Sequence, residues 1–206
     1  MSESHGHVIA TAAKAALTPL GFRRRGQSRI WLADHGFWLS VIEFQPSGWA
    51  KGSYLNVAAH WLWHVTPPVM SFDHCERVGG FADAAEPDFP RLIADMANEA
   101  AATAARQRAR FSSLDAVAAF LIEKEQASRP EAQGDWGAYH AGIAAGLIGQ
   151  EALARQLLSG IGRDILRTTT EMLLAALGPK GAFKAAVQAL NDAERLHYKL
   201  PPWRFS

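Results

Sequence analysis

The spacing of apolar residues in this chain of 206 residues changes from a strand pattern to a helical pattern near residue 88. Before that point, two runs rich in β-branched and aromatic residues flank Asp34-His35-Gly36, a pattern typical of a β-hairpin with a short loop. After it, apolar residues recur with the period of an amphipathic helix. The sequence therefore predicts an α+β fold with a sheet region over residues 1–87. The helical region over residues 88–206 either packs on the sheet or forms a small helical subdomain.

A helix is predicted ahead of the strands. Apolar residues recur every four positions from Val8 to Leu17, which indicates one apolar helical stripe. Thr18-Pro19 and Gly21 end this helix, since proline cannot continue a helix and glycine accepts a left-handed turn. We expect the helix to pack on a small antiparallel sheet, followed by an all-helical C-terminal half.

The segment YLNVAAHWLWHV predicts a third strand with two different faces. The apolar face is expected against the N-terminal helix, with Val57, Ala59 and Trp61 buried beneath it. The other face is mixed and either meets solvent or lines a shallow cavity; it holds Tyr54, Asn56, Ala58, His60 and Leu62. Five of the seven tryptophans lie between residues 31 and 63, which favours a sheet core, with a ligand groove as the alternative.

The helical region begins with a stripe that runs from Phe89 to Ala100. Ser112 and Asp115 resemble a capping box for the next helix. Glycines then separate four short helices, and Gly142 and Gly146 would let a neighbouring helix approach closely. Residues 138–158 resemble a single helix pair of the tetratricopeptide type, which predicts a helical layer rather than a solenoid.

The stretch GFRRRGQSRIW places three arginines between two glycines. It predicts either the solvated edge of a hairpin, where charge prevents pairing with other edges, or a turn that contacts an anion or nucleic acid. Arg23 and Arg24 are therefore candidate binding residues. The net charge is only +1 and both signs are mixed along the chain, so we do not expect nucleic acid to be the main partner.

The loop after the second long strand combines an amide, a hydroxyl and an indole within five residues. Gln45, Ser47 and Trp49 are candidate binding residues on this ground, together with Asn56. In the alternative interpretation, Gln45 and Ser47 only satisfy backbone groups of the turn while Trp49 packs on the sheet.

The sequence predicts no catalytic residue, metal site or cofactor. A single cysteine, Cys75, excludes an intrachain disulfide, and neither a G-x-S-x-G elbow nor a phosphate-binding loop occurs. His60 and His64 lie about 13 Å apart if both belong to a strand, too far to share an ion. The chain also lacks a signal peptide pattern and a long apolar run, so we expect a cytoplasmic protein that does not enter a membrane.

Residues 10 to 65 resemble a bacterial family that is known only as a domain of unknown function. A helix that ends in Leu-Gly-Phe, a strand pair, a Gln-x-Ser element and an Asn-containing strand carry this resemblance; the residues are Leu20, Gly21, Phe22, Gly26, Trp31, Phe44, Gln45, Ser47 and Asn56. The chain departs from the family pattern at Pro46, where a basic residue is usual, and at Ala58, where glycine is usual. The resemblance implies a fold and leaves the function open.

Together these features predict a non-enzymatic cytoplasmic binding module with a protein partner, for example of the toxin-neutralising immunity kind. One alternative is an anion or nucleic-acid binder that uses the turn at Arg23–Arg25. Another is an enzyme whose site lies on the mixed face of the sheet.

Overall fold

The computed structural model describes residues 5–65, 70–128 and 135–205, and it confirms the predicted α+β fold. The chain forms two compact units. The sheet unit consists of Met1–His60 and Met70–Ala109, and the helical unit consists of Trp61–Val69 and Arg110–Ser206. The helix that follows residue 88 thus groups with the strands, because its apolar stripe packs on them.

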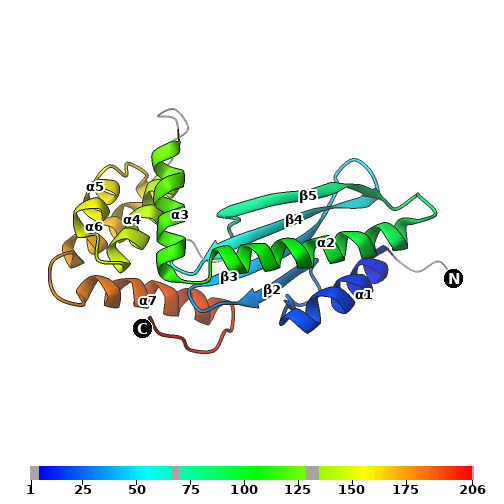
Figure 1. Ribbon diagram of the computed structural model, residues 1–206, viewed down its shortest axis with the longest axis horizontal. Helices are drawn as coiled ribbons and strands as arrows, with labels where there is room; N and C mark the ends of the chain where they lie inside the picture. The colour runs from blue at the N-terminus through cyan, green and yellow to red at the C-terminus, as the bar shows by residue number, and fades with distance from the viewer. Residues whose placement is uncertain (1–4, 66–69, 129–134, 206) are drawn as a thin grey trace. The chain divides into compact units, whose positions relative to one another are not determined.

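The sheet unit contains helix α1 and a five-stranded sheet whose strands follow one another in sequence order (Figure 1). The strand pairs β1–β2, β2–β3 and β4–β5 have antiparallel registers. The elements are α1 (His5–Leu17), the 3₁₀ turn η1 (Thr18–Leu20), β1 (Arg23–Arg24), β2 (Ile30–Asp34), β3 (Trp38–Pro46), β4 (Gly52–Trp61), β5 (His74–Asp83) and α2 (Phe89–Arg110).

The first helix ends, and the hairpin turn between β2 and β3 occurs, where the sequence predicts. Gly21 adopts a φ of 87° after the 3₁₀ turn and Gly36 a φ of 88° between β2 and β3, conformations that glycine accepts without strain. Strand β1 lies at the sheet edge, which agrees with the hairpin-edge interpretation of the arginine stretch, whereas the sequence did not predict β5. The segment of β5 lacks clear apolar alternation and contains Gly79-Gly80, so its extended structure depends on pairing with β4.

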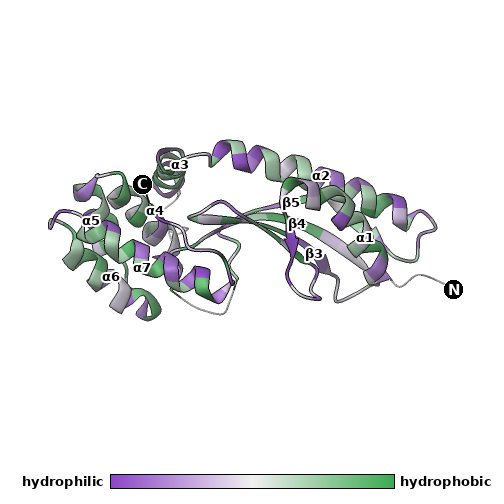
Figure 2. Ribbon diagram, turned by 90° about the horizontal axis from the view of Figure 1, so that it is seen from below, coloured by the Kyte–Doolittle hydropathy of each residue, from purple (hydrophilic) through white to green (hydrophobic). Residues whose placement is uncertain are grey.

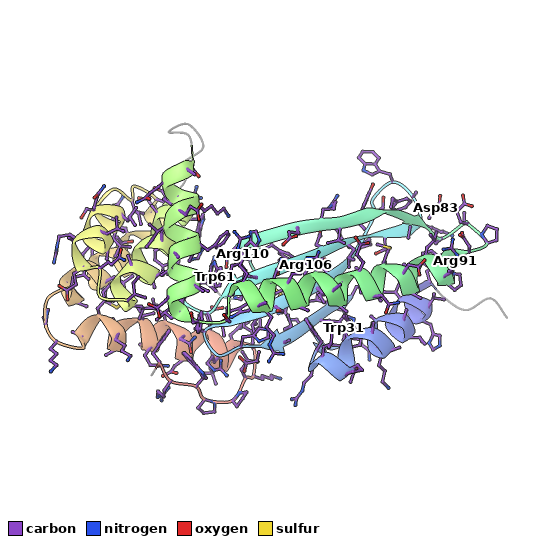
Figure 3. The ribbon with its side chains drawn as sticks, in the orientation of Figure 1. Trp31, Trp61, Asp83, Arg91, Arg106 and Arg110 are labelled. Atoms are coloured by element: carbon purple, nitrogen blue, oxygen red, sulfur yellow. The ribbon has the colours of Figure 1, made fainter. Side chains whose placement is uncertain are left out.

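Helices α1 and α2 both pack on one face of the sheet, which is seen nearly edge-on in Figure 2. Trp31 of β2, labelled in Figure 3, belongs to the core on this face. The shared core includes Ile9, Ala13, Leu17, Trp31, Ile42, Phe44, Leu55, Val57, Phe89, Ile93 and Ala97. Among the described residues of this unit, no helix covers the opposite face. Leu39, Val41, Ala58 and His60 on that face are nevertheless fully buried, so only its part around Tyr54, Asn56, Cys75 and Arg77 reaches solvent. We call this part the uncovered face.

The predicted position of Trp61 beneath the N-terminal helix is wrong, although the side chain is fully buried. Strand β4 ends at Trp61, and the indole stacks on Trp63 at 5.8 Å and meets Phe111 edge-on at 5.3 Å. Figure 3 marks Trp61 at the end of β4. Because the strand stops here, the alternation of β4 does not extend to the last aromatic residues of the segment.

The described residues of the helical unit form the helices α3 (Leu114–Ala127), α4 (Asp135–Leu147), α5 (Glu151–Ser159), α6 (Asp164–Ala176) and α7 (Ala182–His197). The last four correspond to the four short helices that the sequence predicts. The expected cap at Ser112 is off by one residue, because the Ser113 side chain accepts the hydrogen bond from the Ala116 amide. A capping hydroxyl accepts a hydrogen bond from the amide two or three residues further along the chain, and from Ser113 that amide is Ala116.

Close helix packing in this unit depends on two glycines of α4. A Cβ atom at Gly142 would lie 2.8 Å from the Leu158 side chain, and one at Gly146 would lie 2.3 Å from the Phe183 ring. Both predicted close approaches are confirmed. Buried polar contacts add to this packing, since the Tyr139 hydroxyl donates to the Trp63 carbonyl at 2.8 Å.

Candidate functional site

A hydrogen-bonded cluster of polar side chains lies on the uncovered face, across strands β3, β4 and β5. Asn56 is 7% exposed, and its amide nitrogen donates to Glu43 Oε2 and to Gln45 Oε1, both at 3.0 Å. Arg77 donates from Nε to Asn56 Oδ1 at 3.3 Å and from Nη2 to Gln45 Oε1 at 2.6 Å. These bonds hold four side chains of three strands in one fixed arrangement, which we call the polar network.

The strand register explains why the polar network forms. Asn56 is the direct partner of Arg77, so both side chains project from the same face of the β4–β5 pair. The guanidinium also lies over the Tyr54 ring, with Cζ 4.6 Å from its centre. Glu43 precedes Gln45 by two residues in β3, so alternation alone could have identified it, whereas Arg77 could not be found without β5.

The loop between β3 and β4 projects a tryptophan into solvent. Ser47 Oγ accepts from the Trp49 amide at 3.1 Å and from the Ala50 amide at 3.4 Å, and so fixes the turn. The Trp49 side chain is 98% exposed. The alternative in which Trp49 packs on the sheet is therefore wrong, while Ser47 does satisfy backbone groups of its turn.

The arginine stretch forms the short edge strand β1 and the turn after it. Arg24 donates from Nε to the Ser28 carbonyl at 2.7 Å and from Nη2 to the Gln27 carbonyl at 2.9 Å. Its guanidinium therefore stabilises the turn by bonding to the turn backbone. Arg23 is exposed and lines a groove of about 550 Å³ together with Lys14 and Trp31. None of Gln45, Ser47, Trp49 and Asn56 lines this groove, so the predicted binding residues separate into two places.

The histidines of the sheet unit take part in local hydrogen bonds. His60 Nδ1 lies 2.6 Å from Ser71 Oγ, and His35 Nε2 lies 2.9 Å from Ser40 Oγ. The second contact pairs a base with a hydroxyl, as a nucleophilic site would. However, burial and the charge of Arg108 lower the pKa of His35 to about 4, against a smaller opposing effect of Asp34, which makes this imidazole a weak base at neutral pH.

No group of three or more potential metal ligands occurs within residues 5–65, 70–128 and 135–205. Cys75 carries a free thiol on the exposed part of β5, two residues before Arg77. Burial raises the pKa of this thiol; Arg77 opposes the shift, while Glu43 and Glu76 add to it. The uncovered face thus presents amide, guanidinium, carboxylate and thiol groups side by side.

No family model, curated protein or solved structure matches the chain. The resemblance of residues 10 to 65 to a bacterial family accordingly stays a prediction. In the part of the chain that the structure describes, no helix is both long enough and apolar enough to cross a membrane.

Proposed function

We propose that this protein is a non-enzymatic binding module that docks a protein partner on the uncovered face and the β3–β4 loop. The observation that carries the proposal is the nearly full exposure of Trp49 on a loop that Ser47 holds in place. Large aromatic side chains contribute most of the binding energy in many protein interfaces. A free indole on a fixed turn loses little conformational freedom when a partner covers it.

The polar network supports a protein partner in preference to a small molecule. Its side chains bond to one another along three strands instead of converging on an enclosed space. Such a fixed polar surface can orient a partner by charge and hydrogen bonding while the adjacent indole supplies apolar contact area. Neutralisation of a toxin in the cytoplasm is one role for such a module, suggested by analogy with other small α+β proteins.

The test compares one tryptophan variant and one leucine variant with the wild type. The partner is captured in a pull-down from the native host and then titrated against each protein. Trp49→Ala should weaken binding about thirtyfold or more, which corresponds to about 2 kcal/mol. Its unfolding free energy should change by less than about 0.5 kcal/mol, because the side chain contacts solvent. Leu196→Ala removes another exposed apolar side chain, on α7 of the helical unit, and should leave binding unchanged.

Cys75 provides an independent footprint of the same surface, because it is the single thiol of the chain. Alkylation is best measured near pH 9, since burial raises the thiol pKa and so reduces the thiolate fraction at neutral pH. A bound partner should slow alkylation of Cys75 severalfold. A partner that binds tightly without slowing this reaction, and without dependence on Trp49, would place the docking surface elsewhere.

A further inference from the structure

A polar hollow of about 400 Å³ lies against the β3–β4 loop, with His5 at the start of α1 among its lining residues. Its walls are the loop residues 46–52 together with the side chains of His5 and Arg29. The lining residues include Arg29, Lys51 and His5 but no aspartate or glutamate. We call it the Arg29 hollow.

The positive charge of the Arg29 hollow is not balanced by the described residues around it. Arg29 Nη1 is buried and has no hydrogen-bond partner. Within residues 5–65, 70–128 and 135–205, neither Arg29 nor Lys51 forms an ion pair. Arg91 on α2 shows the usual arrangement, because it bonds to both Asp88 and Asp95.

An unpartnered guanidinium nitrogen that is shielded from water is unfavourable, and a chain usually supplies it with an acceptor. The planar fork of arginine matches the two oxygens of a carboxylate or phosphate group. Lys51 adds a second cation at the same wall, and Trp49 lines the hollow with an indole that the body of a ligand can cover.

We propose that the Arg29 hollow binds an oxyanion, either a carboxylate or a phosphate group, with Arg29 as its main ligand and Lys51 as a supporting charge. The bound oxyanion is a group of the docking partner, and in this respect the inference rests on the proposed function. The hollow can nevertheless be tested with the isolated chain, so a failure of one proposal is distinguishable from a failure of the other.

The experiment is a titration of the full ¹⁵N-labelled chain with inorganic phosphate at constant ionic strength, followed by NMR. The backbone amides of residues 48–52 and the indole N–H of Trp49, assigned with Trp49→Phe, should shift saturably with a Kd on the order of 1 mM. Arg29→Gln should raise this Kd at least tenfold. Arg23→Gln removes the same charge from the neighbouring groove and should change the Kd less than twofold.

Thermal unfolding of Arg29→Gln shows whether the variant is intact. Because the guanidinium has no partner, its melting temperature should equal or exceed that of the wild type. A parallel titration with acetate identifies the source of the group: similar saturation favours a carboxylate of the partner, and much weaker saturation favours a phosphate.

Three results would overturn the oxyanion site: shifts that do not saturate with either anion, shifts that persist in Arg29→Gln, and equal losses in Arg29→Gln and Arg23→Gln. The last result would indicate a general attraction of polyanions, such as nucleic acid, to the basic edge of the sheet. If phosphate does not bind while Trp49→Ala still loses the partner, only the oxyanion site is removed and the proposed docking surface stands.

Discussion

The two faces of the sheet share the same strands but differ in what their side chains contact. Val57 points to the face beneath α1 and α2 and is fully buried in an apolar core. Its neighbour Asn56 points to the uncovered face and bonds to three other polar side chains. The comparison shows that the apolar face beneath the helices holds the unit together, whereas the polar residues of the uncovered face can serve recognition.

The difference follows from whether the side chains of each face are removed from water. Apolar burial stabilises roughly in proportion to the area removed from water, so the covered face carries most of the stability. On the uncovered face, hydrogen bonds compete with water and each contributes only about 1 kcal/mol. Substitutions on the two faces of one strand should therefore differ severalfold in their effect on unfolding.

Phe44 and Glu43 are neighbours in β3 and give the sharpest test of this difference. Phe44 is fully buried on the covered face, so Phe44→Ala should lower the unfolding free energy by about 3–5 kcal/mol. Glu43→Ala removes one acceptor of the polar network and should cost less than about 1 kcal/mol. Urea denaturation of both variants measures the two values, and similar values would show that the uncovered face is also core.

The covered face is the part of the fold that sequence patterns predict well. The four-residue repeat of α1, the stripe of α2 and the alternation from Leu55 to Ala59 all identify side chains that the structure buries. Apolar periodicity reports burial directly, so it needs no knowledge of the partner element.

The candidate site was only partly predictable, because apolar periodicity reports burial and does not report contacts between polar side chains. Gln45 was identified by its chemistry and Asn56 by the family-like pattern, but Arg77 belongs to β5, whose sequence carries no strand pattern. Its contact with Asn56 is set by the register of β4 and β5, a long-range property of the folded chain. The exposure of Trp49 was likewise undecided, because an indole suits both a core and an interface.

The second prediction concerns pH, because the covered face also desolvates a titratable group. His35 packs near Arg108 of α2, and its pKa falls from 6.5 to about 4 on folding. Between these values the unfolded chain binds more protons, so stability is complete above about pH 6.5 and falls as the pH drops toward 4. The loss should approach about 3 kcal/mol, from about 1.4 kcal/mol for each pKa unit.

Urea denaturation at pH 7 and pH 4.5 measures this effect. His35→Asn should remove much of the difference between the two pH values, whereas His7→Asn, at an exposed position of α1, should retain it. An unchanged pH dependence in His35→Asn would mean that the covered face does not desolvate this imidazole as strongly as its burial indicates.

The third prediction concerns the hydrogen bonds of Asn56 within the polar network. Asn56→Ala removes two donated hydrogen bonds and one accepted bond, yet water can reach the exposed Arg77 and part of Glu43. The cost should therefore be about 1–2 kcal/mol, well below that of Phe44→Ala.

A double-mutant cycle with Arg77→Ala separates this cost into its parts and should give a coupling energy of about 0.5–1 kcal/mol. A coupling near zero would mean that Asn56 and Arg77 face solvent independently, and the uncovered face would then lack the fixed arrangement on which orientation of a partner depends. A total cost above about 3 kcal/mol would instead make the network part of the core and reduce the contrast between the two faces.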